Sequence, residues 1–316
     1  MHIVLLFPGQ SSRYPGMLRK LSAVRPDVVA PLFRHAEDVL GQSVTVYDAC
    51  ESTSARNLDI QLSVFLANHA YAEILRAEGI EGDASVGLSL GEYNHLVHIG
   101  VLRFEDALRL VAARGAAYDQ GPAGAMAAVF PIDESTVDGA VARAAGRGVV
   151  EVATFNSPTQ FVLAGERVAI DEAVRILEDE QAATAVFIDE RLPMHSSLFS
   201  AVAARFRPSL EAAPVRVPRR PYVPNVLGRI TDTLTPQVIR SLLVEQVHKP
   251  VRFRQSVDAI SDRFSDAIYV EVGPRGVLYN LLSKKWRPFR RYKTDAEADR
   301  FATATSELVH ELRRAA

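Results

Sequence analysis

The sequence predicts an α/β fold in which a large domain is interrupted by a small inserted α+β subdomain. Residues 1–120 alternate short apolar segments with longer helical patterns, which is typical of α/β proteins. Residues 125–190 follow the order strand, helix, strand, strand, helix, strand, the split βαβ pattern of a ferredoxin-like unit. The α/β rhythm then resumes. We therefore predict a large domain over 1–124 and 191–316, with a ferredoxin-like subdomain over 125–190.

Each element follows from a local pattern. Apolar runs at 2–7 and 84–86 predict two buried strands, the first ending at a Pro-Gly turn. Apolar residues at helical spacing predict helices over 60–78 and 104–119. In the insert, the predicted strands are AMAAVF, VVEVATF, QFVLAG and ATAVFID, and the predicted helices are ESTVDGAVARAA and RVAIDEAVRILEDE. After the insert, AIYVEVG predicts a strand, and PRGVLYNLLSKKW, at 274–286, predicts a helix.

Composition predicts a globular protein that does not bind membranes. The 316 residues are 48% hydrophobic and carry a formal net charge of -2, which argues against bulk nucleic-acid binding. No apolar run approaches the roughly 20 residues that span a bilayer, and the first residues lack a signal-peptide pattern. The single cysteine, Cys50, excludes an internal disulfide and a thiolate metal cluster. We therefore expect a cytoplasmic location and no metal.

One local basic segment stands out against this charge balance. KKWRPFRRYK gathers six positive side chains near the C-terminus: Lys284, Lys285, Arg287, Arg290, Arg291 and Lys293. Such a segment is either solvated surface or a docking site for an acidic partner. The sequence leaves both interpretations open.

The stretch VGLSLGE indicates a nucleophilic serine. Ser89 lies between Gly87 and Gly91 where a short strand turns into a helix. A GxSxG sequence forms a tight turn that exposes the hydroxyl at the start of the helix, whose amides face any oxyanion formed there. Packing alone also favours small residues at such a turn, so the motif needs support from elsewhere in the chain.

A serine nucleophile needs a base, and the histidines differ in their context. His95 and His98 lie on the helix that follows Ser89, and we expect them to point away from the turn. His195 and His248 remain, and His195 is favoured because it follows the insert in a non-periodic segment, where clefts form. The alternative is a loop histidine bonded to the backbone.

Arg114 is the second informative residue. Leu110 and Val111 precede it by four and three residues on an amphipathic helix, which places the guanidinium on the apolar side. A buried guanidinium needs an anionic partner. That partner is either an internal Asp or Glu or the carboxylate of a substrate, and both alternatives stay open here.

An oxyanion hole needs two donors. The backbone amide of Leu90, after the serine, supplies one, and the FPGQSS turn offers the amide of Gln10 as the second. Alone, FPGQ is only a loop signal.

Together these segments resemble the malonyl-CoA:acyl carrier protein transacylase family, which includes the acyltransferases of polyketide synthases. FPGQSSRYPGM is similar to the family's FPGQGSQ signature, VGLSLGEYNHLV to its GHSLGE turn, and LVAARG to its MRG helix; Gln61 falls in its TQPA-like segment. GAMAAVF, FNSPTQFVLAG, PMHSSLF, PVRF and VEVGPRGVL follow in the family's order. The resemblance runs nearly end to end and implies an α/β-hydrolase-like large domain.

The resemblance also implies the roles of the site residues. Ser89 becomes the nucleophile, His195 the general base, Gln10 and Leu90 the oxyanion hole, and Arg114 the group that binds a malonyl carboxylate. In the family a backbone carbonyl orients the histidine, which here points to the neighbourhood of Val251 and Arg252. Asn156 and Asn225 match family asparagines near the cleft and are expected to line the substrate site.

The chain departs from the family pattern around the acyl pocket. Leu88 stands where the residue before the serine is usually histidine, and Met194 stands before the base in place of phenylalanine or serine. Ser11 and Arg13 replace the glycine and glutamine of GQGSQ. These changes leave the identity of the acyl group open.

The resemblance implies a ping-pong acyltransferase that needs no bound cofactor. An acyl-CoA or acyl-phosphopantetheine thioester would acylate the serine, and an acidic acyl carrier protein would dock transiently and take the acyl group. Open alternatives are a carrier-to-carrier transferase for a bulkier acyl group, a thioester hydrolase, and a non-enzymatic carrier-docking module. A general α/β-hydrolase would need an acid between serine and histidine in chain order, and the insert and Arg114 argue against it.

Overall fold

The structure is a computed structural model that describes residues 2–48, 56–231, 234–283 and 286–315. Cys50, Lys284 and Lys285 lie outside the described residues. Sheet A is parallel, with the strand order β2-β1-β7-β8. Its strands are β1 (Ile3–Phe7), β2 (Ala84–Gly87), β7 (Ile268–Glu271) and β8 (Arg290–Lys293). Because the strands are parallel, the loops after Phe7 and Gly87 leave the same edge of the sheet.

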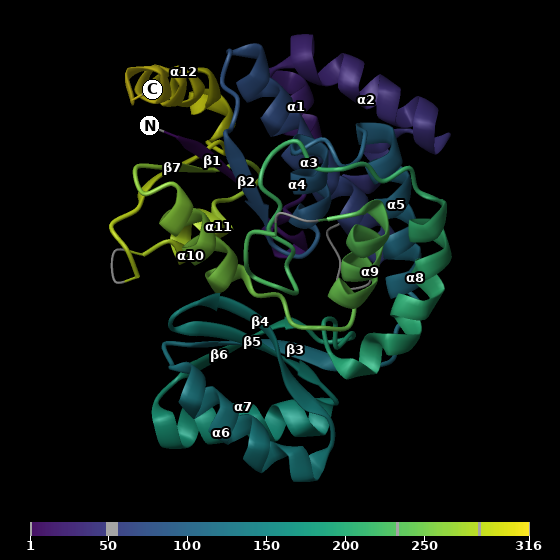
Figure 1. Ribbon diagram of the computed structural model, residues 1–316, viewed down its shortest axis with the longest axis vertical. Helices are drawn as coiled ribbons and strands as arrows, with labels where there is room; N and C mark the ends of the chain where they lie inside the picture. Colours follow the sequence, from purple (N-terminus) through teal and green to yellow (C-terminus); the bar gives the residue numbers. More distant parts are fainter. Residues whose placement is uncertain (1, 49–55, 232–233, 284–285, 316) are drawn as a thin grey trace.

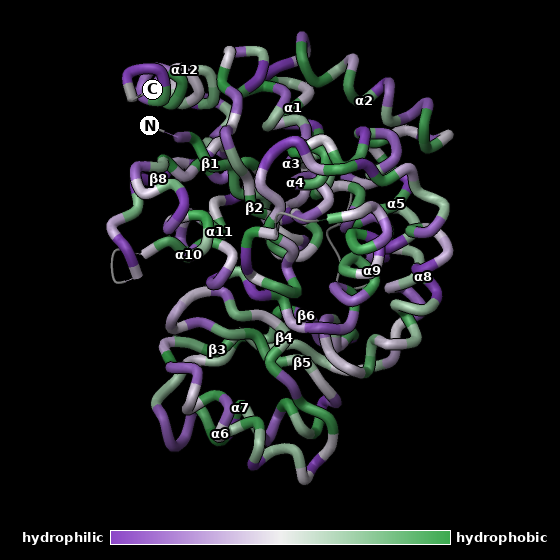
Figure 2. The backbone as a smooth tube through the Cα atoms, in the orientation of Figure 1, coloured by the Kyte–Doolittle hydropathy of each residue, from purple (hydrophilic) through white to green (hydrophobic). Residues whose placement is uncertain are grey.

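Helices surround sheet A. They are α1 (Met17–Val24), α2 (Pro26–Leu40), α3 (Asn57–Ala77), α4 (Gly91–His98), α5 (Phe104–Tyr118), α8 (Ser200–Ala212), α9 (Pro236–Gln246), α10 (Phe253–Arg263), α11 (Val277–Leu281) and α12 (Phe301–Ala315). Figure 2 shows α2, at the outside, mixing hydrophilic and hydrophobic residues, as expected for a helix with one buried face. By contrast, α3 is buried along most of its length, because it packs against α5, α2 and α4 at once.

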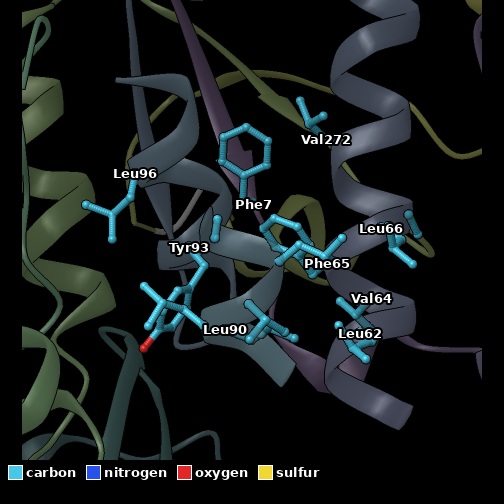
Figure 3. Close-up of a cluster of buried hydrophobic side chains, with 14 of the residues drawn as sticks. Phe7, Leu62, Val64, Phe65, Leu66, Leu90, Tyr93, Leu96 and Val272 are labelled. Carbon is cyan, nitrogen blue, oxygen red and sulfur yellow. The ribbon is translucent and has the colours of Figure 1, made fainter. Parts of the chain in front are cut away.

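The main core lies between β1, α3 and α4. Figure 3 shows Leu90 and Tyr93 beside Phe7 of β1 and Phe65 of α3, and all four are fully or almost fully buried. Leu90 immediately follows the serine of the GxSxG turn, so its side chain anchors that turn in the core.

Sheet B is antiparallel, with the order β4-β5-β3-β6. It comprises β3 (Ala125–Phe130), β4 (Val150–Ser157), β5 (Gln160–Gly165) and β6 (Thr184–Asp189), with helices α6 (Glu134–Ala144) and α7 (Arg167–Gln181). Figure 1 shows both helices on the face that points away from sheet A. Ala127 and Val129 of β3 pack toward these helices, whereas Met126 and Ala128 join the main core on the other face.

Backbone hydrogen bonds join sheet B to the rest of the molecule. The Val251 N–H donates to the Ala153 carbonyl, and the Phe155 N–H donates to the Val251 carbonyl, each at 2.9 Å. Val251, just before α10, therefore pairs with Thr154 as a single parallel bridge along the outer edge of β4. This contact fixes the position of sheet B relative to the edge of sheet A where the GxSxG turn lies.

The observed elements agree with the predicted ones where the local pattern was strong. The predicted helices over 60–78 and 104–119 correspond to α3 and α5. The helix predicted over 274–286 is wrong in length, because α11 is a single short turn of five residues that begins after Gly276 in the left-handed region. Strand β8 falls within the basic segment and was not predicted. No helix among the described residues is long and apolar enough to cross a bilayer.

Candidate active site

The turn after β2 holds Ser89 in a strained conformation. Its φ is +52°, in the left-handed region that few residues other than glycine adopt. A Cβ at Gly87 would lie 2.2 Å from the backbone of Gly91, and a Cβ at Gly91 would lie 2.0 Å from the Phe7 carbonyl oxygen. Glycine is therefore required on both sides of the serine: a side chain at Gly87 would collide with the start of α4, and one at Gly91 would collide with the end of β1.

Ser89 and His195 lie in hydrogen-bond contact although the sequence separates them widely. The Ser89 Oγ is 2.7 Å from the His195 Nε2. The other ring nitrogen, Nδ1, is 2.7 Å from the backbone carbonyl oxygen of Gln246, at the end of α9. That carbonyl only accepts, so Nδ1 carries the proton and Nε2 accepts from the serine.

The prediction that Val251 or Arg252 orients the histidine is wrong. The Val251 carbonyl accepts from Phe155, and the Arg252 N–H donates to the Asn225 carbonyl at 2.8 Å, so the backbone of this segment serves to join the sheets. The orienting carbonyl belongs to Gln246, earlier in the chain.

His195 is a neutral imidazole in this environment. Burial lowers its pKa to about 3, and the positive charge of Arg114 acts in the same direction. A neutral histidine with a free lone pair on Nε2 is the form that a general base requires.

Arg114 is fully buried beside the serine. Its guanidinium donates to the Gln61 Oε1 at 2.7 Å and to the Ser89 Oγ at 3.2 Å, and it lies 4.2 Å from the ring centroid of Tyr118. Among the described residues no carboxylate forms an ion pair with it, and its Nε has no partner. The buried Glu92 carboxylate interacts with the Arg114 charge only beyond ion-pair distance, so the direct acidic partner that the sequence left open is not found in the described part of the chain.

Asn225 has a different position from the one predicted. We expected it to line the substrate site, but its side chain is fully occupied by the backbone of the turn. The Oδ1 accepts from the Ser89 N–H and the Nδ2 donates to the Gly87 carbonyl, both at 2.7 Å. Asn225 therefore holds the turn in place.

Sequence reasoning missed a buried acid behind the serine. The Glu92 carboxylate accepts from the Tyr222 hydroxyl at 2.6 Å and from the Gln246 side chain at 2.7 Å. The same Gln246 amide donates to the Ser89 carbonyl at 2.8 Å. Burial raises the pKa of Glu92 to about 7. Its place in the first turn of the helix after the serine is the signal that could have pointed to it.

A cleft opens over the serine between the two sheets. Ser89 and His195 line it together with the predicted Leu88, Met194, Asn156 and Gln10, with the loop residues Ser11 and Arg13, and with Met126, Val162 and Ile188 of sheet B. The Gln10 side chain contacts the Met194 sulfur at 3.5 Å. Among the described residues, the backbone N–H groups of Gln10 and Leu90 have no acceptor. Two free amides therefore border the serine, as an oxyanion hole requires.

The basic segment lies away from this cleft. Arg287 pairs with Asp258 at 3.1 Å and with Asp262 at 2.8 Å, and Arg291 donates to the Tyr279 carbonyl. Arg290 begins β8, at the end of sheet A opposite to the turn that carries Ser89. The described arginines of the segment thus have partners of their own or lie far from the serine, and Lys284 and Lys285 are not described.

Comparison with known proteins identifies the family. The acyl transferase domain family matches residues 4–307. The chain belongs to this acyltransferase family. The malonyl CoA-acyl carrier protein transacylase of Bacillus subtilis is 30% identical over 304 residues, which cover 94% of this chain and 93% of that protein. The enzyme of the same name from Escherichia coli K12 is 32% identical, over 88% of this chain and 91% of its own length.

Solved structures of similar proteins share the fold of this acyltransferase over its whole length. FabD from Acinetobacter baumannii superimposes with a TM-score of 0.89 at 27% identity, and covers 100% of this chain and 99% of its own. A malonyl-transacylase in complex with its holo type II polyketide synthase acyl carrier protein superimposes with a TM-score of 0.85 at 29% identity, over 97% and 100% of the two chains. The family resemblance drawn from the sequence motifs is confirmed.

Proposed function

We propose that this acyltransferase moves a malonyl group from CoA, through an ester on Ser89, to the phosphopantetheine thiol of an acyl carrier protein. The observation that carries the proposal is Arg114, a fully buried cation in contact with the serine and without an acidic partner among the described residues. A malonyl carboxylate would supply the missing anion. The relatives named as malonyl transacylases support the same acyl group.

In the first half-reaction, the neutral His195 takes the hydroxyl proton while the Ser89 Oγ attacks the thioester carbonyl carbon. The carbonyl electrons move to the oxygen, which the amides of Gln10 and Leu90 stabilise. When the intermediate collapses, the carbon–sulfur bond breaks and His195 returns the proton to the CoA sulfur. The serine then carries the malonyl ester.

In the second half-reaction, the carrier thiol repeats the sequence in reverse. His195 takes the thiol proton, the sulfur attacks the ester carbonyl, and the Ser89 oxygen leaves with the proton from His195. Water would compete at this stage. The cleft between sheets A and B limits its access to the ester.

Arg114 would select the acyl group and influence the base. A malonyl carboxylate that binds Arg114 neutralises the charge that depresses the pKa of His195, so the base becomes stronger when the correct substrate is bound. A neutral acyl group would leave the guanidinium buried and unpaired.

We also propose the domain division predicted from the sequence. Sheet B with α6 and α7 would form a ferredoxin-like subdomain over 125–190, and 1–124 with 191–316 an α/β-hydrolase-like domain. The strand order β4-β5-β3-β6 supports the first, and the serine turn at the edge of the parallel sheet supports the second.

Intact mass spectrometry tests the function. The protein is incubated with malonyl-, acetyl- and longer acyl-CoAs, and then with holo carrier protein. We expect a malonyl adduct that Ser89→Ala abolishes and that the carrier removes. Malonic acid as the main product, with no transfer to the carrier, would instead indicate the thioester hydrolase, and a bulkier acyl adduct would indicate the other transferase.

A further inference from the structure

Strand β6 carries two exposed apolar side chains next to the cleft. Val186 and Ile188 are 47% and 44% exposed, and both belong to the few large hydrophobic residues that the described chain leaves exposed. Ile188 also lines the cleft with Ser89 and His195. We call Val186 and Ile188 the β6 strip.

The β6 strip lies on the face of sheet B that is directed toward sheet A, which is also the face that lines the cleft. Val186 pairs with Ala128 of β3, which belongs to the core on the side of sheet A, whereas the alternate residues Ala185 and Phe187 pack toward α6 and α7. Exposure alternates along β6, with Val186 and Ile188 exposed and the residues between and before them half-buried, so the two share one face although the pairing with β3 shifts register beside Ile188. Val186 therefore lies roughly 7 Å along the strand from Ile188, just outside the lining of the cleft.

The outer edge of β6 pairs with no other strand in the described part of the chain, since β6 is the last strand of sheet B. The Ala185 N–H donates to the Glu178 side chain at 3.1 Å, so it points away from β3. By the same alternation, the N–H and C=O of Phe187 point to the free edge. The strip is thus bordered by a backbone donor and acceptor.

We propose that the β6 strip binds the pantetheine arm of the thioester substrate, with the geminal methyl groups of the arm on Val186. The inference rests on the proposed transfer from a pantetheine thioester. Ile188 lines the cleft and Val186 follows it outward on the same face of β6, so an arm that leaves Ser89 past Ile188 would reach Val186. Its methylene and methyl groups match the apolar side chains, and its amides match the polar edge at Phe187.

Three malonyl donors of different length test the assignment. Malonyl-CoA and malonyl-pantetheine contain the geminal methyl groups, whereas the N-acetylcysteamine thioester ends before them. Val186→Asn should raise KM for the two longer donors by roughly tenfold without changing kcat, because apolar contact is lost. Acylation by the short donor should stay within about twofold.

Two further variants serve as controls. Val168→Asn changes a valine that is 60% exposed on α7, across sheet B from the cleft, and should behave as the parent on all donors. Val186→Thr keeps the shape and strand preference of valine, so it should raise KM for the long donors by a smaller factor, about threefold, even if Val186→Asn folds poorly.

Three results would overturn the assignment. The first is an unchanged KM for the long donors in both Val186 variants, and the second is an equal loss of acylation with all three donors. The third is a loss confined to transfer onto the carrier protein, which would mean that the strip contacts the surface of the carrier protein. If the parent protein forms no adduct with any donor, the proposed function itself fails, and this separates the two failures.

Discussion

Two serines close together in the chain, Ser85 on β2 and Ser89 in the turn after it, form hydrogen bonds with histidines, and only Ser89 has the surroundings of a nucleophile. The Ser85 hydroxyl on β2 lies 2.6 Å from the His95 Nδ1, and the Ser89 hydroxyl lies 2.7 Å from the His195 Nε2. Burial lowers the pKa of both histidines to about 3. Distance and pKa therefore do not distinguish the two pairs.

The surroundings of the two serines distinguish them. Ser85 is fully buried within β2, and a second histidine, His98, shares its hydroxyl at 2.8 Å. Ser89 lies beyond the strand end with φ at +52°, lines the cleft, and contacts Arg114. The Ser89–His195 pair thus differs from the Ser85 contacts in its strained turn, its opening to the cleft and its free neighbouring amides, which are the features that a nucleophilic serine needs.

Loss of the base should give the largest difference between the pairs. His195→Gln should reduce acylation by malonyl-CoA roughly 10²- to 10⁴-fold, because the serine loses its proton acceptor. The matched variant His95→Gln should retain most of the acylation rate, even if its melting temperature is lower. Rapid-quench measurement of the adduct compares them. Similar losses in two folded variants would mean that the pairs are not functionally different.

Removal of the guanidinium should come next. Arg114→Ala should slow malonyl loading roughly 10- to 100-fold and raise acetyl loading relative to it, because the carboxylate loses its buried partner. Arg109→Ala is the control on the same helix, since Arg109 is 58% exposed and pairs with Asp106. Competition between malonyl- and acetyl-CoA, read by intact mass, gives the ratio. An equal loss for both acyl groups would contradict the carboxylate role.

The pH dependence of the rate should show a smaller effect of Arg114, through the pKa of His195. His195 acts in its neutral form, and its lowered pKa keeps it neutral well below the ordinary value of 6.5. The acid limb of kcat/KM should therefore fall below pH 6.5. Arg114→Ala removes one cause of the shift, so the limb should move toward 6.5 without reaching it, because burial is the larger cause. If the acid limb does not move in Arg114→Ala, the charge of Arg114 does not influence the pKa of His195.

Charge reversal in the basic segment should have the smallest effect. Arg290→Glu should change transfer to the carrier by less than about twofold, because the residue lies at the opposite end of sheet A and exposed charges contribute little. Carrier transfer measured over a range of salt concentrations checks this. A large loss with a steep salt dependence would instead favour the docking site, the other interpretation that the sequence left open.

The parts of the site that local patterns describe could be predicted from the sequence. The GxSxG pattern predicted the tight turn, and the structure shows that the two glycines leave room for the start of α4 and for the end of β1. His195 stood out by its place in a non-periodic segment. Arg114 stood out because helical spacing put its charge on a buried face.

The parts that depend on tertiary contacts could not be predicted. The carbonyl that orients His195 is a backbone group, and a backbone acceptor has no residue signature, so the sequence pointed to Val251 when the structure uses Gln246. The sequence left open whether Arg287 belongs to solvated surface or to a docking site. Its partners, Asp258 and Asp262, come from α10, and only the fold brings them together.

The site of acylation tests the central claim most directly. After incubation with malonyl-CoA, proteolysis releases a peptide that contains both Ser85 and Ser89, and fragmentation mass spectrometry locates the malonyl group within it. We predict that the group is on Ser89 and that Ser85→Ala does not change this. A malonyl group on Ser85, or a protein acylated only outside this peptide, would contradict the assignment of Ser89 as the nucleophile.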